Sequence, residues 1–149
     1  MIVRREKDQD TPMKIKNLSL LIVELYEKLS SWEEDVVRGS GLTTTQAHII
    51  DIVGHSGSIK MKDLAEKTGV TTGTLTVAAD RLEERKLLKR KPHESDRRSY
   101  LIELTPEGES YFKQHHKFHL RMTEDLVSDL TEKEQEIFAG IIEKVLRKI

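Results

Sequence analysis

Residues 64–105 read LAEKTGVTTGTLTVAADRLEERKLLKRKPHESDRRSYLIELT, and this stretch decides the fold of the chain. Two short helical patterns meet at Gly69 and are followed by two strand-like patterns on either side of a loop rich in Arg and Lys. A helix beside a cationic hairpin suits the grooved surface of a polyanion. The order of these patterns therefore predicts a winged helix-turn-helix that reads DNA.

The second helix of this stretch has a well-marked start at Thr71, a favourable N-cap residue. Val70 and Leu75 stand at the spacing of a hydrophobic staple, and the apolar residues that follow predict a helix reaching about Lys86. Small and polar side chains at a helix N-terminus allow close approach to base edges and phosphates. The residues on or near the open face are Thr72, Gly73, Thr76, Val77, Asp80 and Arg81.

The segments Leu88–Lys91 and Tyr100–Leu104 read as two strands. Residues 92–99 between them are too many for a tight hairpin, so we expect this loop to project as a wing. From Arg85 to Arg98 there are seven basic and two acidic residues, a net charge of +5 that leaves −6 for the rest of the chain. Affinity for a polyanion is therefore expected in this segment rather than over the whole surface.

The N-terminal part of the chain predicts one long amphipathic helix and two shorter ones. The glycines after Arg38 end the first helix, and Thr43 with Gln46 forms the capping-box pattern that opens the second. The expected elements are a helix from Met13 to about Val37, a helix from Thr43 to about Gly54, a turn over residues 55–58, and a helix over Lys60–Thr68.

The C-terminal part predicts two more helices. Thr105 followed by Pro106 is typical of a helix start, and this helix should run to about Ser128. Thr131 with Glu134 is a second capping-box pattern, and the last helix should reach about Lys148.

Composition sets outer limits on the function. A chain of 149 residues suits one compact domain, and the absence of cysteine excludes disulfides and thiol-based sensing. No apolar run approaches the ~20 residues needed to cross a bilayer, so we expect no membrane partner. The absence of cysteine fits the cytoplasmic location that we expect. Residues 1–12 read as a mobile polar arm. We expect 43–105 to form the DNA-binding region, with 13–42 and 106–149 as a helical dimerisation region.

The ordered motifs resemble those of the MarR family of transcriptional regulators, over about residues 13–149. The residues that carry the resemblance are Leu64-Ala65-Glu66, Gly69-Val70, Thr74-Leu75-Thr76, Asp80-Arg81-Leu82-Glu83, Asp96-Arg97-Arg98 and Leu104-Thr105-Pro106-Glu107-Gly108. The fold class this implies is mainly α with a small β wing, a winged helix-turn-helix flanked by N- and C-terminal dimerisation helices.

The resemblance also implies roles for particular residues. Residues 71–77, Thr74 included, would enter the major groove, and Arg98 or Arg97 at the wing would reach the adjacent minor groove. Asp96 would hold the Arg98 guanidinium in a bidentate pair, while Arg90 and Lys91 would meet phosphates. Family members act as homodimers on pseudo-palindromic operators in double-stranded DNA, usually as repressors relieved by a ligand.

Histidines raise the question of the effector. His115 and His119 stand one helical turn apart, and His48 and Glu34 are further candidates for an effector or metal site. Zinc-responsive family members look similar at the three histidines, and so do the fatty-acid-synthesis repressors, which respond to acyl-carrier protein. The residues leave three readings open: polar members of a packing face, neighbours of an acyl or other apolar ligand, or ligands of a regulatory zinc.

No glutamate follows either histidine in the arrangement of a zinc hydrolase, so we expect no enzyme and no required cofactor. The function expected from the sequence is a sequence-specific DNA-binding regulator, with a ligand-responsive repressor as its most specific form. A winged-helix protein-interaction module without DNA binding, or a metal-responsive regulator using His48, His115 and His119, is the alternative.

Overall fold

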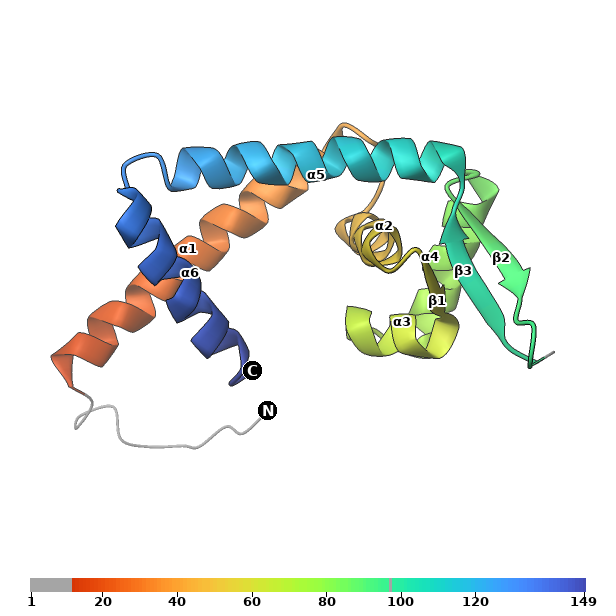
Figure 1. Cartoon of the computed structure of the whole chain (residues 1–149), viewed down its shortest axis with the longest axis horizontal. Coiled ribbons are helices and arrows are strands. Elements are labelled where there is room, and N and C mark those ends of the chain that lie inside the picture. The colour runs from red at the N-terminus through yellow and green to blue at the C-terminus, as the bar shows by residue number, and fades with distance from the viewer. Residues whose placement is uncertain (1–11, 97) are drawn as a thin grey trace. The chain divides into compact units, whose positions relative to one another are not determined.

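The computed structural model describes residues 12–96 and 98–149. The predicted arm, apart from Pro12, and the candidate Arg97 lie outside the described residues. The chain forms two compact units, Met1–Ala47 and His48–Ile149. The elements in order are α1 (Met13–Arg38), α2 (Thr44–Ser56), β1 (Ser58–Lys60), α3 (Met61–Thr68), α4 (Thr72–Glu84), β2 (Leu88–Pro92), β3 (Tyr100–Leu104), α5 (Pro106–Leu126) and α6 (Glu132–Leu146) (Figure 1).

Helix α1 has the extent that its apolar periodicity predicts. Of the two glycines after it, Gly41 takes the left-handed conformation with φ of 70°, while Gly39 stays in the right-handed region at −66°. The steric relief that only glycine offers is therefore needed at Gly41 alone. Much of the apolar stripe is open to solvent, with Ile15 53% and Ile22 57% exposed.

Helix α2 opens with the predicted capping box. The Thr43 amide donates to Oε1 of Gln46 at 3.0 Å, and the Gln46 amide donates to Oγ1 of Thr43 at 3.2 Å. The helix runs two residues past the predicted end at Gly54, to Ser56, and Gly57 closes it with φ of 72°. The predicted turn over residues 55–58 was therefore too long, because its first two residues continue the helical hydrogen-bonding pattern.

The core of the second unit lies between α3, α4 and the sheet. Leu64 of α3 and Leu75 and Leu82 of α4 have no exposed surface, and Ile102 of β3 is 1% exposed. Gly69, with φ of 68°, ends α3 and accounts for the sharp turn into α4. Three short elements thus enclose one apolar centre, which fixes the surface that α4 presents outward.

The sheet has three antiparallel strands in the order β1-β3-β2. The pair β2 and β3 was predicted, with Leu88 opposite Leu104 and Pro92 opposite Tyr100. Strand β1 was missed: residue 58 was expected in a turn and Lys60 in a helix. Three residues are too few to show a strand period, and β1 forms only because β3 pairs with it across 43 positions of sequence, Ile59 with Ile102.

The C-terminal helices begin where the sequence predicts. The Thr105 hydroxyl accepts from the Gly108 amide with Pro106 at the first helical position, and Thr131 and Glu134 form a complete capping box. Both helices end two residues earlier than expected. The predicted fold class, mainly α with a small β wing, is confirmed. In residues 12–96 and 98–149 no helix is long and apolar enough to span a membrane.

Candidate nucleic-acid interface

The N-terminus of α4 is held by its own side chains. Oγ1 of Thr71 accepts from the Thr74 amide at 3.2 Å, so Thr71 is the predicted N-cap. The Thr71 hydroxyl also donates to Oγ1 of Thr74 at 3.0 Å, and the Thr76 hydroxyl donates to the Thr72 carbonyl at 2.8 Å. These local bonds orient the threonine hydroxyls before any partner arrives. The positive end of the helix dipole lies at the same place, which favours an anion there.

The outer face of α4 is open and small. Thr72, Thr76 and Arg81 are exposed, and Val77 is 53% exposed although it is apolar. A Cβ built on Gly73 would meet nothing within 4 Å, so the fold itself does not require glycine there. A surface with threonine hydroxyls, the apolar side chain of Val77 and a glycine has the hydrogen-bonding groups and the lack of bulk that base edges in the major groove require.

Strand β2 separates two cations that the sequence analysis had grouped together. Successive side chains of a strand point to opposite faces. Leu88 is buried, so Arg90 shares its face and Lys91 takes the other. Arg90 donates from Nη1 to Oε2 of Glu83 at 2.9 Å and from Nη2 to Oδ1 of Asp80. The structure pairs the Arg90 guanidinium with two acids of α4, which the sequence analysis did not expect, and contact of Arg90 with phosphates stays a prediction.

The wing loop is ordered around Asp96. Oδ1 of Asp96 accepts from the Arg98 backbone amide at 3.0 Å, and the Asp96 carbonyl accepts from the Ser99 amide at 3.1 Å. The His93 amide donates to the Ser99 carbonyl at 3.1 Å and so closes the loop. The expected bidentate pair between Asp96 and the Arg98 guanidinium is absent from the described ion pairs. Asp96 instead fixes the backbone that carries Arg98.

Lys91 and Arg98 remain as exposed cations of the wing. Neither takes part in an ion pair with another described residue, whereas Lys89 is 3.5 Å from Glu103 on the neighbouring strand. The candidate Arg97 lies outside the described part of the chain. The structure therefore places Lys91, Arg98 and the open face of α4 on one compact unit.

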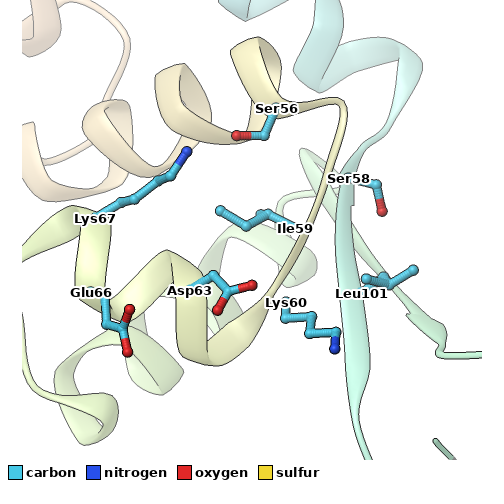
Figure 2. Close-up of a pocket in the computed structure, with 8 residues that line it drawn as sticks. All are labelled: Ser56, Ser58, Ile59, Lys60, Asp63, Glu66, Lys67 and Leu101. Atoms are coloured by element: carbon cyan, nitrogen blue, oxygen red, sulfur yellow. The ribbon is translucent and has the colours of Figure 1, made fainter.

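A hollow of about 690 Å³ is lined by the end of α2, by β1 and α3, and by Leu101 of β3 (Figure 2). Ile59 lies at its centre, and Lys60, Asp63, Glu66 and Lys67 come from the β1–α3 segment. Two ammonium groups and two carboxylates balance in charge. The hollow therefore adds no cationic surface to α4 and the wing.

The structure brings together two of the predicted effector residues. His115 is 4% exposed, and its Nε2 is 2.9 Å from Nε2 of His119. Tyr111, one turn earlier, stacks on His115 with ring centroids 5.7 Å apart. His48 is exposed on α2, and Glu34 is exposed on α1, which belongs to the other compact unit.

Sequence reasoning overlooked Asp80 and Glu83 as partners of Arg90. The sequence analysis placed Asp80 on or near the open face of the helix and named no cation as its partner. The signal was the strand alternation of Leu88, Lys89 and Arg90, which places the third side chain on the same face as the buried first one. A cation on a core-facing position needs a carboxylate within reach, and an i, i+3 pair of acids on the preceding helix supplies two.

Comparison with known proteins is consistent with this arrangement. The sequence model of the MarR family matches residues 42–100. MhqR of Bacillus subtilis, an HTH-type transcriptional regulator, is 25% identical over 132 residues, 87% of this chain and 91% of MhqR. The multiple antibiotic resistance protein MarR of Salmonella typhimurium is 31% identical over 108 residues, 72% of this chain and 73% of that protein.

A solved structure extends the likeness to the fold. Streptococcus pneumoniae FabT in complex with DNA matches with a TM-score of 0.82 at 22% identity, over 89% of this chain and 95% of that one. The family consists of regulators rather than enzymes, as the sequence analysis expected. With 31% identity to MarR over most of both chains, and with the winged helix-turn-helix described above, this chain belongs to the MarR family of DNA-binding transcriptional regulators.

Proposed function

We propose that the protein is a ligand-responsive repressor that binds a pseudo-palindromic operator as a homodimer in the cytoplasm. One observation carries the proposal: a capped helix with a small, open outer face and a wing bearing Lys91 and Arg98 belong to the same compact unit. Phosphate contacts give affinity without sequence preference, and base contacts give specificity. The two elements have the chemistry for these two tasks.

In this proposal α4 enters the major groove. Thr72 and Thr76 offer hydroxyls to base edges, and Val77 offers methyl groups to the C5-methyl of thymine. Thr74 is exposed, but its hydroxyl accepts from Thr71, which makes it a supporting residue of the helix start. Arg81 lies further along the exposed side of the helix, where it would meet a phosphate.

The wing takes the adjacent minor groove. A narrow minor groove has an enhanced negative potential, which favours an arginine at the tip of a loop. Arg98 belongs to the wing loop, with its backbone amide held by Asp96. Lys91, on the outward face of β2, would neutralise a phosphate.

Dimerisation is supported by apolar surface that a single chain leaves in water. On α6, Ile137, Ile141 and Val145 are each more than half exposed and lie on one stripe. The exposed stripe of α1 has the same character. Burying such stripes between two copies removes apolar area from water, and a two-fold dimer matches a pseudo-palindromic DNA site.

The effector is proposed as a small molecule or an acyl-carrier protein, in line with the resemblance to fatty-acid-synthesis repressors. A regulatory zinc is the second candidate, favoured by the pair His115 and His119. Two nitrogens that share one zinc ion at 2.0–2.1 Å stand roughly 3.4 Å apart, and these two are 2.9 Å apart. The pair would supply two of the ligands that zinc needs.

Calorimetric titration with zinc separates these candidates. Binding by the parent protein that disappears in the double variant His115→Ala, His119→Ala supports the metal. Absence of heat from the parent removes it and leaves the small-molecule or acyl-carrier effector.

The repressor proposal is tested by selecting duplexes from random DNA and measuring affinity for the selected site by fluorescence anisotropy. We expect a two-fold symmetric site, two chains per duplex, and repression of a reporter gene that carries the site. A folded protein that selects no sequence and binds no duplex at low salt would instead be a protein-interaction module.

A further inference from the structure

The bridge between Arg90 and α4 has a clear structural origin. Arg90 lies directly opposite Ile102 on the neighbouring strand and shares its core-facing side. Ile102 is 1% exposed, whereas the Arg90 side chain keeps 30% of its surface. The aliphatic part of Arg90 therefore covers the edge of the core, and the guanidinium emerges beside α4.

Two carboxylates of α4 receive the guanidinium. Asp80 and Glu83 stand three residues apart, so they lie on the same side of the helix. Asp80 binds Nη2 and Glu83 binds Nη1 at 2.9 Å, which fixes the planar fork in one orientation. The hydrogen bond with Asp80 is also the largest cause that raises the pKa of Arg90 above its ordinary value, so the charge is permanent.

The bridge adds to two other attachments between α4 and the strands of the wing. One is the apolar core that Leu75 and Leu82 of α4 share with Ile102 of β3. The other is the short connection from α4 to β2, where Lys86 takes a left-handed φ of 58° and the Leu87 amide donates to the Leu82 carbonyl at 2.9 Å. Apolar contacts have no preferred direction, whereas the bridge links the side of the helix to the strand through hydrogen bonds of fixed geometry.

We infer that Asp80, Glu83 and Arg90 form a brace that positions α4 relative to the wing, so that both elements engage one DNA duplex together. The inference rests on the proposed reading of DNA by α4 and Arg98. Asp80, Glu83 and Arg90 are positioning residues in this role, because they act through the elements that contact the bases and phosphates.

Removal of the Asp80 and Glu83 carboxylates should change affinity for DNA in two opposite ways, one through charge and the other through the brace. A carboxylate on a DNA-binding unit repels phosphates, so its removal by itself raises affinity for any duplex. Loss of the brace lowers affinity for the operator, because α4 and the wing are no longer held in the relative position that lets both contact one duplex. The control is Glu84→Gln, since Glu84 is an exposed acid of the same helix and forms no ion pair with another described residue.

The experiment compares the full-length parent with Glu83→Gln, Asp80→Asn plus Glu83→Gln, and Glu84→Gln. Affinity for the selected operator and for an unrelated duplex is measured across salt concentrations. We expect the double variant to bind the operator about fivefold to tenfold more weakly and the unrelated duplex at least as well as the parent. Its operator salt slope should fall by about 1–2, the loss expected when one or two phosphate contacts of the wing are missing.

A further cycle combines the double variant with Arg98→Ala. If the brace positions the wing, Arg98→Ala costs less in the double variant than in the parent, because the arginine no longer reaches its groove. Circular dichroism and thermal melts establish the folded fraction. The milder Glu83→Gln variant gives the same comparison should the double variant unfold. A purely structural role would lower the active fraction while leaving the ratio of operator to unrelated affinity and the salt slope unchanged.

Failure of the proposed function and failure of the brace give different results in this experiment. A parent protein that binds no operator contradicts the proposed function. A parent that binds its operator, with a folded double variant that binds it equally well or more tightly, as Glu84→Gln should, contradicts the brace alone.

Discussion

Gly108, in the first turn of α5, lies so close to Leu87 that a Cβ on residue 108 would stand 2.0 Å from the Leu87 carbonyl oxygen. That carbonyl accepts from the Thr105 amide at 3.1 Å, and the Thr105 hydroxyl donates to the Lys86 carbonyl. The start of α5 is therefore fixed against the turn that leads from α4 into the wing.

We expect Gly108→Ala to destabilise the protein by about 3 kcal/mol, because backbone atoms on both sides must move apart. Gly140→Ala is the control, since a Cβ on that glycine of α6 would meet nothing within 4 Å. The control should stabilise the protein by about 0.5–1 kcal/mol through helix propensity. Chemical denaturation measures both, and equal stabilities for the two variants would contradict the close packing.

Substitution of Gly73 should raise the stability of the protein but lower its affinity for the operator. The fold leaves room for a Cβ there, so Gly73→Ala should stabilise α4 by about 0.5 kcal/mol. The added methyl group stands on the face proposed to enter the major groove, and we expect affinity for the operator to fall about tenfold. Gly140→Ala again serves as the control. Anisotropy that shows unchanged binding by Gly73→Ala would place the DNA elsewhere.

Arg98 of the wing should contribute to operator affinity but not to the stability of the fold. We expect Arg98→Ala to weaken operator binding by about 1–3 kcal/mol and to leave the melting temperature unchanged, because Arg98 is exposed. Asp96→Ala should weaken binding less, since it removes only the acceptor of the Arg98 amide. Arg121→Ala on α5 controls for the loss of one positive charge. An equal effect of Arg98→Ala and Arg121→Ala would contradict the wing assignment.

The α6 stripe should determine the oligomeric state. Ile141→Glu places a carboxylate in the middle of the exposed apolar stripe, where pairing with a second chain would bury it. We expect sedimentation to show a monomer and operator affinity to be lost. Glu143→Lys changes the charge on the opposite side of α6 and should leave the dimer intact. A parent protein that sediments as a monomer would contradict the homodimer outright.

The stability of the capping box at the start of α6 should depend on pH. The backbone and side chain of Thr131 donate to Glu134, and these hydrogen bonds lower the pKa of its carboxyl below the ordinary 4.5. A lowered folded-state pKa stabilises the helix start above the ordinary value, and this stabilisation is lost as the pH falls through the lowered one. The protection factors of the amides at residues 131–134, which compare their exchange rates with those of an unfolded chain at the same pH, should therefore fall at acidic pH.

Glu134→Gln supplies the control for that titration, because Gln keeps an acceptor for the Thr131 amide but carries no titrating group. We expect the protection factors at the start of α6 to lose their acid-dependent fall in this variant. A fall of the same size in the variant would assign the effect to another group.

The local parts of this protein follow from the sequence alone. Thr71, Thr105 and Thr131 cap their helices because a hydroxyl reaches an amide three residues ahead, an interaction complete within one turn. The apolar stripes likewise mark one face of each long helix. Both partners of such an interaction lie within a few residues of each other in the chain. The helix starts and the two wing strands could therefore be predicted from the sequence.

Tertiary structure decided what depends on residues far apart in the chain. Strand β1 exists because β3 pairs with it, and Arg90 meets Asp80 and Glu83 because α4 packs beside β2. The sequence shows Arg90 and Lys91 as neighbours of like charge, yet the strand turns them to opposite faces, and of the two only Arg90 pairs with described acids. The sequence determines the charge of each side chain, but the group that pairs with that charge is determined only when the helices and strands pack together.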